Sequence, residues 1–317
     1  MHKRFVNQCT LDISLRPKGP VLIKSGKEGA DPTKPDMEFV ETYHAGGRSI
    51  YLPGSSLKGA IRAHAERIVR TLGSDERPSD PAALWASNPL NRDSFKYLEK
   101  EKDSRRVYKL SSFTDQLFGS VAIASRLRIE DAYPNDLQQV KTEERNGVAI
   151  DRVFGSVAVG PFNYQVCTAG EFRTKIYIKN FTLAQLGLLG LVLRDLNEGW
   201  FGIGFAKSRG MGLVTVTLNQ ATVEYPGCVI TDGKINALGS NQLWNQGDLI
   251  GAGAFLSPAE QAQYGFPADD VQATHAVGEL MDYDLGVRLT WPKSKVKDLF
   301  TCAVAAWRQQ LPRGIAA

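Results

Sequence analysis

The stretch Tyr51-Leu-Pro-Gly-Ser-Ser-Leu-Lys-Gly-Ala-Ile-Arg62 marks the start of a helix. A loop with a Pro-Gly turn leads into it, and Ser55 or Ser56 is the expected N-cap. Gly73 then supplies a stop signal. Apolar residues recur at helical spacing between these two ends: Leu57, Ile61, Ala65, Ile68 and Leu72. The pattern predicts one amphipathic helix.

Strands are predicted on both sides of this helix. Apolar and polar residues alternate over residues 8–15 before it, over 121–129 after it, and again over 172–178 and 214–218. Between the last two, Thr182-Leu-Ala-Gln185 is a capping box that opens a second helix. The order β-α-β-β-α-β predicts an α+β fold with a ferredoxin-like, or RNA-recognition-motif, core.

The remaining segments are predicted to be insertions and an extension. Residues 1–222 hold the core, with a charged insertion at about 74–110 that includes a short helix near 96–102. A second insertion is expected at about 148–174. Residues 223–317 are predicted to form an extension packed on the core. Long surface loops are expected over 219–280, and a final helix is expected around 296–307.

The composition limits the class of protein. The formal net charge of +4 suits a nucleic-acid binder without requiring one. The cysteines are scattered with no C-x-x-C pair, so a structural zinc site and a disulfide framework are not expected. No apolar segment follows the Met1-His-Lys-Arg start, and the apolar stretch 186–193 is too short to cross a bilayer. We therefore expect a soluble, reduced, cytoplasmic protein without a membrane partner.

The start of the first helix carries residues that suit phosphate binding. Ser55 and Ser56 stand beside the free backbone N–H groups and the positive end of the helix dipole. Lys58 and Arg62 are four residues apart and share one helical face. The alternative is a well-capped helix with two solvated cations.

A second segment, Gly202-Ile-Gly-Phe-Ala-Lys-Ser-Arg-Gly-Met-Gly212, surrounds Lys207, Ser208 and Arg209 with glycines. Glycines allow close approach of backbone N–H groups to a phosphate, and cations neutralise it. The segment follows a helix and precedes a strand, which excludes the dinucleotide fingerprint and the Walker loop. A turn that needs positive φ would explain the glycines but not the Lys-Ser-Arg between them. Together the two segments indicate a nucleic-acid ligand.

Both segments, in this order, resemble the RAMP superfamily of CRISPR-associated proteins, whose glycine-rich loop lies just before the last core strand. Phe118-Gly119, Asp131-Ala132 and Ile150-Asp151-Arg152 also look like the pattern of that superfamily. The resemblance covers roughly residues 5–220. It is closest to the repeated backbone subunit of type III effector complexes, which serve antiviral defence.

The resemblance implies a ribonucleoprotein subunit that stacks along a guide RNA (crRNA). Its partners would be the guide, the target RNA, other effector subunits and copies of itself. Residues from Val148 to about Thr174 would form the thumb, a hairpin that separates neighbouring segments of the duplex. The residues expected to hold guide phosphates are Ser55, Ser56, Lys58, Arg62, Lys207, Ser208 and Arg209.

In active members of the family, an acidic residue on the loop after the first strand cleaves target RNA with a divalent metal. Counting back from Pro53, and matching Phe39-Val40 to the family's apolar pair, we place this carboxylate and the metal, Mg²⁺, at Asp36, with Asp31 as second choice. The 2′-hydroxyl would attack the adjacent phosphate and leave a 2′,3′-cyclic phosphate. The alternative is that both aspartates are turn residues beside prolines.

Two other functions stay open at this point. One is a metal-independent endonuclease that processes guide RNA, with His44 or His64 as the general base. The other is a scaffold that binds RNA without cleaving it. Cleavage that survives EDTA would favour the first, and cleavage unaffected by Asp36→Ala and Asp31→Ala would remove the catalytic role of this loop.

Overall fold

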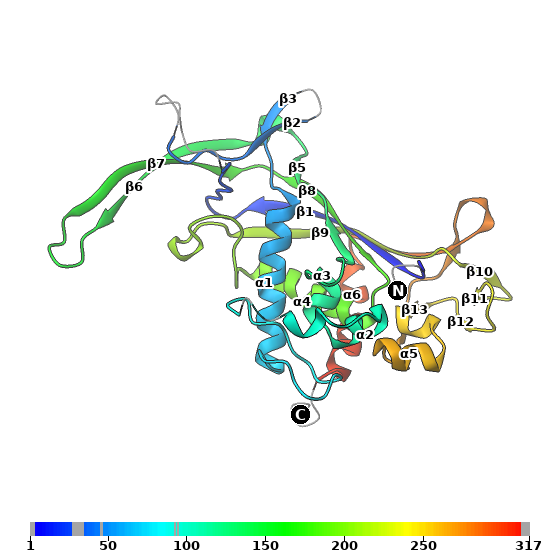
Figure 1. The fold of residues 1–317 in the computed structure, drawn as a ribbon. Helices are drawn as coiled ribbons and strands as arrows, with labels where there is room; N and C mark the ends of the chain where they lie inside the picture. The colour runs from blue at the N-terminus through cyan, green and yellow to red at the C-terminus, as the bar shows by residue number, and fades with distance from the viewer. Residues whose placement is uncertain (1–3, 27–34, 45–46, 92, 94, 312–317) are drawn as a thin grey trace.

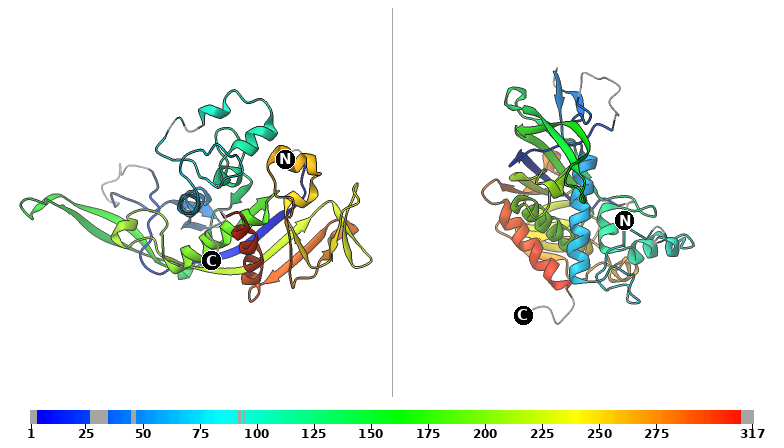
Figure 2. Two further views of the ribbon diagram at one scale, coloured as in Figure 1. Left: turned by 90° about the horizontal axis from the view of Figure 1, so that it is seen from below. Right: turned by 90° about the vertical axis from the view of Figure 1, so that its left-hand side faces the viewer.

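The computed structural model describes residues 4–26, 35–44, 47–91, 93 and 95–311. It is a mixed α+β structure with a large antiparallel sheet, and helices α1, α4 and α6 lie on one face of that sheet (Figures 1 and 2). Apolar side chains from the sheet and these helices form the main core between them. In the described part of the chain, no helix is both long and apolar enough to cross a membrane.

The sheet order is β15-β16-β9-β1-β8-β4, and β5 also pairs with β8. The predicted strands at residues 8–15, 172–178 and 214–218 are confirmed as β1, β8 and β9. Each of them buries alternate apolar residues against the helices, which is why the period of two was visible. The bounds of the central strands are β1 Gln8–Pro17, β4 Leu127–Ile129, β5 Tyr133–Pro134, β8 Phe172–Lys179 and β9 Val214–Tyr225.

Two helices connect the central strands. Helix α1 (Gly54–Leu72) lies between β1 and β4 in the chain, and α4 (Leu183–Glu198) lies between β8 and β9. The predicted capping box at Thr182 and Gln185 is present. Gly199 ends α4 in the left-handed conformation. The predicted final helix is confirmed as α6 (Val296–Gln309), which packs across α4.

The charged insertion differs from the prediction. The helix expected near 96–102 is a single 3-10 turn, η1 (Lys96–Leu98), and two helices that we did not predict follow it, α2 (Ser104–Leu110) and α3 (Phe113–Phe118). The strand expected over 121–129 contains only β4, because residues 127–129 are the part of this stretch that pairs with β8. The residues before β4 form an exposed turn.

A long hairpin projects from the body of the molecule (Figure 1). It consists of β6 (Lys141–Ile150) and β7 (Val157–Ala169), so it begins earlier than the insertion expected at 148–174. It also ends earlier, because Phe172 and the residues after it belong to the central strand β8. Near its root lie three short elements: β2 (Glu41–His44), β3 (Gly47–Ile50) and η2 (Leu137–Gln139).

The prediction of long loops over 219–280 was wrong. Strand β9 continues to Tyr225, and β16 extends the main sheet beside it. The strands in this region are mostly two to four residues long, too short to show a period. The elements are β10 Cys228–Thr231, β11 Lys234–Ala237, β12 Leu243–Asn245, β13 Asp248–Ile250, η4 Ala252–Phe255, α5 Pro258–Tyr264, β14 Val271–Ala273, β15 Glu279–Leu280, η5 Asp282–Asp284 and β16 Val287–Pro292.

Candidate nucleic-acid interface

The start of α1 is held against the residues that follow β4. Gly54 opens the helix, and a Cβ at this position would overlap the carbonyl oxygen of the last β4 residue. The Asp131 carboxylate accepts a hydrogen bond from the Gly54 N–H at 2.7 Å. The N-cap is therefore Pro53, and the prediction of Ser55 or Ser56 was wrong, because a carboxylate from another element satisfies the helix end.

Ser55 and Ser56 occupy the first turn of α1. Ser55 is exposed and Ser56 is half-buried. The N–H groups of a first turn have no carbonyl one turn earlier within the helix, and the positive end of the helix dipole lies here. With neither serine needed as a cap, both hydroxyls lie beside these donors at the helix start.

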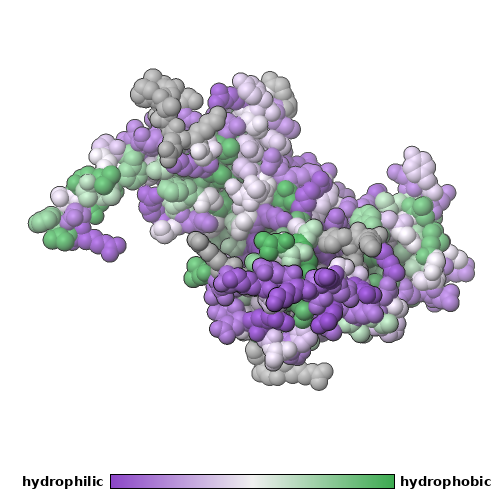
Figure 3. All heavy atoms as spheres, viewed as in Figure 1, coloured by the Kyte–Doolittle hydropathy of each residue, from purple (hydrophilic) through white to green (hydrophobic). Residues whose placement is uncertain are grey.

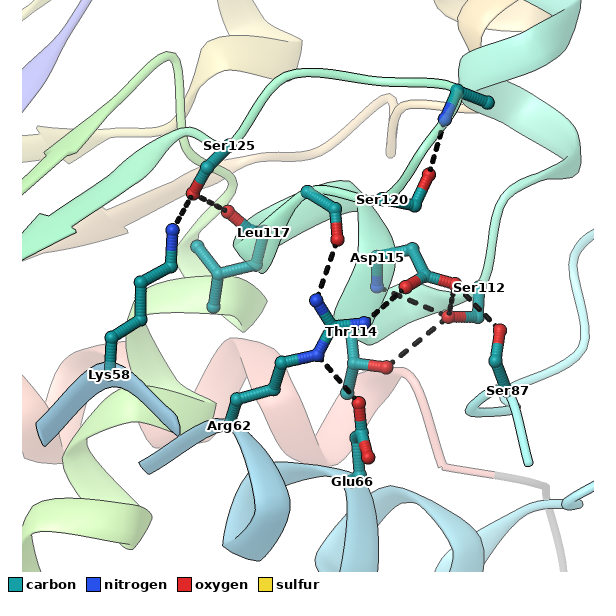
Figure 4. Close-up of polar contacts among 12 residues, drawn as sticks. Lys58, Arg62, Glu66, Ser87, Ser112, Thr114, Asp115, Leu117, Ser120 and Ser125 are labelled. Carbon is teal, nitrogen blue, oxygen red and sulfur yellow. Dashed lines mark hydrogen bonds and ion pairs between the residues drawn. The ribbon is translucent and has the colours of Figure 1, made fainter. Parts of the chain in front are cut away.

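Lys58 and Arg62, in contrast, extend toward α3 and the residues between α3 and β4 (Figure 4). The Lys58 ammonium donates to the Ser125 hydroxyl at 2.8 Å. Burial, and then the charge of Arg62, lower the pKa of Lys58. The Arg62 guanidinium donates to the Glu66 carboxylate and to the Gly119 carbonyl, each at 2.8 Å.

The third partner of Arg62 is Asp115, at 2.7 Å. Asp115 is only 1% exposed and also accepts hydrogen bonds from the hydroxyls of Ser87 and Ser112, each at 2.6 Å. Ser112 in turn caps α3. Arg62 thus joins α1 to α3 and to the residues before β4, and all three of its guanidinium nitrogens donate to groups of the protein. The structure places Arg62 in an internal network rather than on the same open surface as Ser55.

The second segment presents its cations to solvent. Lys207–Arg209 form a single 3-10 turn, η3, and Lys207, Ser208 and Arg209 are all exposed. Left-handed residues flank the turn, Ala206 with φ 56° and Gly210 with φ 79°. The Arg209 guanidinium lies 5.2 Å from the centroid of the Phe205 ring. The loop that carries η3 lies at the same end of the molecule as the β6–β7 hairpin (Figures 1 and 2).

The glycines of this loop have a structural role. Gly204 and Gly212 have φ values of 75° and 87°, and a Cβ at Gly204 would overlap the Leu22 carbonyl oxygen. The Gly212 N–H donates to the Pro20 carbonyl at 2.8 Å, and Phe205 N–H donates to Leu22 at 2.7 Å. These glycines therefore let the loop lie against the segment after β1, which in turn fixes the position of η3.

Asp36 lies beside the hairpin, about halfway along β7. Its side chain is exposed, and one carboxylate oxygen accepts a hydrogen bond from the Asn163 N–H of β7 at 2.8 Å. The main chain of Met37 pairs with β7 as well, through bonds of 3.1 Å to Asn163 and 3.0 Å from Gln165. Asp31, the second choice for the same role, lies outside the described residues.

A metal at Asp36 would need ligands beyond the protein groups that the structure describes. No three His, Cys, Asp or Glu side chains gather into a metal-binding cluster within the described ranges. Mg²⁺ is commonly held by one or two carboxylates together with substrate phosphates and water, so a single exposed carboxylate is compatible with it.

Comparison with protein-family models finds a match to the RAMP superfamily over residues 14–215, which is more than half of the chain. The chain belongs to the RAMP superfamily. This family comprises CRISPR-associated RNA-binding proteins, and the matched residues include Asp36, the α1 start and η3. A search of curated proteins finds no match to this RAMP protein.

The two histidines considered as general bases of this RAMP protein differ in environment. His64 is buried, its Nε2 lies 2.8 Å from the Asp195 carboxylate, and its ring stacks on Phe201 at 4.3 Å. This is a buried core histidine. His44 is exposed and stacks on Tyr133 at 3.7 Å. The Tyr133 hydroxyl lies 3.4 Å from Asp131, which places His44 near the start of α1.

The hairpin of this RAMP protein has an apolar far end that the sequence analysis did not single out. Large apolar side chains gather there on the surface (Figure 3). Phe154, at the turn, is 84% exposed. The alternation of apolar residues over 148–159 was the available signal. The exposed residues are Val148, Ile150, Val153, Phe154, Val157 and Val159.

Proposed function

We propose that this RAMP protein is the crRNA-binding backbone subunit of a type III CRISPR effector complex, and that it cleaves the paired target RNA as a metal-dependent endoribonuclease. The observation that carries the proposal is the exposed Lys207–Arg209 turn, held by the glycine loop at the same end of the molecule as the long hairpin. A cationic turn beside a projecting hairpin suits a protein that follows an RNA backbone over its length.

We further propose that the central strands form a ferredoxin-like core. The strand order β9-β1-β8-β4, with α1 and α4 as the two connecting helices, supports this assignment. The hairpin and the glycine loop are then additions to that core, placed at one end of it.

The proposed grip on the guide is independent of its sequence. Lys207, Ser208 and Arg209 offer two charges and a hydroxyl, and Ser55 and Ser56 offer hydroxyls beside the N–H groups of the α1 start. Such contacts go to phosphate oxygens, while base pairing between guide and target supplies the specificity. Lys58 adds positive charge beneath this surface. Arg62 acts indirectly, because its hydrogen bonds hold α1 in position.

The hairpin suits contact with neighbouring molecules in an assembly. An apolar patch at the end of an otherwise exposed hairpin is unusual for a monomer and typical of an interaction site. In a filament of copies, this end would meet the adjacent subunit or bases of the duplex, as the family's thumb does.

We propose that Asp36 is the catalytic carboxylate. Its exposed side chain beside the middle of β7 would meet the target strand where the hairpin separates two segments of the duplex. Mg²⁺, held by Asp36 and phosphate oxygens, would supply charge stabilisation for attack by the 2′-hydroxyl. Asp36 itself would hold the metal or orient that hydroxyl, and its bond to Asn163 fixes the carboxylate toward the RNA-facing end.

The first test is to purify the tagged chain from its native host and sequence the RNA that accompanies it. RNAs with a common repeat-derived 5′ end and variable spacers are the expected result. Random or absent RNA would contradict the effector role, whatever the outcome of cleavage assays.

The second test measures target cleavage by the assembled complex. Asp36→Asn should reduce cleavage at least about 100-fold while leaving guide binding intact, and EDTA should have the same effect. Glu144→Gln, an exposed carboxylate on the neighbouring strand β6, is the matched control. If Asp36→Asn and Asp31→Asn each cleave as fast as the parent protein, neither aspartate is catalytic, and the scaffold function remains for this chain.

A second candidate function is metal-independent processing of guide RNA with His44 as the general base. Its exposure and its position near the start of α1 favour this candidate over one that uses His64. Cleavage of a repeat-containing RNA that persists in EDTA and disappears in His44→Ala would establish it and displace the target-cleavage proposal.

A further inference from the structure

Arg126 is an unusual residue in the body of this protein. It lies at the end of the exposed turn before β4 and is only 3% exposed. One of its terminal nitrogens, Nη1, donates to the Tyr108 hydroxyl at 2.8 Å and to the Asn180 carbonyl at 2.7 Å. Its Nε and Nη2 are buried without a hydrogen-bond partner. In the part of the chain that the structure describes, no carboxylate forms an ion pair with it.

This arrangement is energetically costly as it stands. A guanidinium is always charged in proteins, and a buried charge is normally paired with an acid and satisfied by hydrogen bonds. The two unpaired nitrogens form one edge of the guanidinium, and their N–H groups run parallel. That edge is the one that binds two oxygens of a phosphate or carboxylate at once.

Aromatic rings hold the guanidinium in place. Its carbon lies 4.1 Å from the centroid of the Tyr108 ring and 5.4 Å from that of Phe266. Tyr108 and Phe266 stack at 5.3 Å, and Tyr264 meets both edge-on at 6.3 and 6.0 Å. The orientation of Arg126 is therefore set before any ligand binds.

A cavity of about 700 Å³ adjoins this cluster. Arg126, Tyr108 and Tyr264 line it, and the cations Lys102 and Arg105 lie along its edge. The one acid among its lining residues, Asp103, already accepts from Arg105 at both the main-chain N–H and Nε. The cavity is thus positively charged, and its volume is in the range of small-ligand sites.

We propose that this cavity binds a nucleotide, with the phosphate on the Nε and Nη2 edge of Arg126 and the base against the partly exposed Tyr264 ring. Phosphate matches the unpaired edge, and a base matches the aromatic wall. Because both nitrogens are sealed from solvent, entry requires a shift of the turn at residues 121–124, which is largely exposed. The nucleotide is either free in solution or the 5′-terminal residue of an RNA.

The site lies away from the proposed guide grip. Helices α2 and α5 pack together at the end of the molecule opposite the β6–β7 hairpin (Figures 1 and 2), and Arg105 bonds to Gln263 of α5 at 2.9 Å. The nucleotide site therefore does not depend on the proposed function, and substitutions at Lys207 and Arg209 should not affect it.

The test uses the full-length chain, purified free of nucleic acid, in thermal unfolding with AMP, inorganic phosphate or adenosine. AMP at about 100 times its Kd should raise Tm by about 5 °C, phosphate should raise it less, and adenosine should leave it unchanged. Equal shifts with AMP and adenosine, or none with AMP, would overturn the proposal.

Variants assign the shift to Arg126. Arg126→Gln should abolish the AMP effect, whereas Arg106→Ala, on α2 but outside the cavity, should retain it. If Arg126→Gln does not fold, Ala124→Trp narrows the cavity from its exposed edge with Arg126 intact, and it should also abolish the shift. If AMP still raises the Tm of Ala124→Trp, and of Arg126→Gln where that variant folds, the assignment of the nucleotide site to this cavity is contradicted.

The source of the nucleotide is decided with short RNAs in a Lys207→Ala/Arg209→Ala background, which removes the proposed grip. A larger shift with a 5′-phosphate RNA than with its 5′-hydroxyl counterpart identifies a terminal residue. Equal shifts, together with an AMP response, identify a free nucleotide. Unsubstituted protein that fails to bind guide but responds to AMP would contradict the proposed function and support this site.

Discussion

The start of α1 and the η3 turn look alike in sequence and differ in the structure. Both place a lysine and an arginine close together beside small residues. In α1, Lys58 and Arg62 donate hydrogen bonds to groups of the protein itself, and Arg62 pairs with Asp115 in a buried network. In η3, the cations face solvent. The comparison teaches that a cationic motif predicts a ligand only where no carboxylate of the same chain already binds it.

The strongest way to break this comparison is Arg62→Ala. We expect it to lower the free energy of unfolding by about 3 kcal/mol, because Asp115 is left buried without its counter-ion. Urea denaturation measures the loss. Arg67→Ala, an exposed arginine on the same helix, is the control and should change stability by less than about 0.5 kcal/mol. A loss no larger than that of the control would mean that Arg62 is available to RNA after all.

The next test separates the two roles of the glycine loop. Gly204→Ala should cost about 2 kcal/mol, because the residue has φ 75° and its Cβ would overlap the Leu22 carbonyl. Gly210→Ala has φ 79° but meets open space, and should cost about 1 kcal/mol. Thermal or urea unfolding compares them. Equal costs would show that the contact with the segment after β1 does not fix the loop.

Removal of the η3 cations should affect RNA rather than stability. Lys207→Ala/Arg209→Ala should weaken binding to single-stranded RNA of any sequence. The slope of the logarithm of the binding constant against the logarithm of the salt concentration should become shallower by roughly 0.7 for each cation removed. Stability should change by less than about 0.5 kcal/mol, since both side chains are exposed. An unchanged salt slope would remove η3 from the interface.

Lys58→Met gives the smallest expected effect and sharpens the boundary between the two regions. The methionine keeps the apolar part of the side chain, and the lost bond to Ser125 is a single one, so stability should fall by about 1 kcal/mol or less. The RNA salt slope should change less than for a single η3 substitution. A larger change in slope would place Lys58 in direct contact with phosphate.

Sequence patterns were sufficient where an element buries one face and carries its own caps. The alternation in β1 and β8 and the Thr182–Gln185 box of α4 each reflect local chemistry, and all were confirmed. The predicted strand over 121–129 was wrong over residues 121–126, because a strand also needs a neighbour and, within this stretch, only residues 127–129 pair with β8. Short strands such as β10 lack the length to show a period.

The site was predictable only in part, for a similar reason. The exposed Lys207–Arg209 turn could be predicted from the glycines around it. The Arg62 side chain instead points inward because it pairs with Asp115, which is 53 residues further along the chain. The Asp131 cap of α1 is more distant still, 77 residues from the Gly54 N–H that donates to it. Ser112, three residues before Asp115 and typical of an N-cap, was the available sign that a short helix presents this carboxylate.

The pairing of Met37 with β7 has a mechanical consequence. The segment that carries Asp36 is bonded to the hairpin, by Asp36 to Asn163 and by Met37 to Gln165. These bonds lie about halfway along the hairpin, between its root and its apolar end. A partner that binds the apolar end and shifts the hairpin would therefore shift the Asp36 carboxylate as well, by less than the end itself moves.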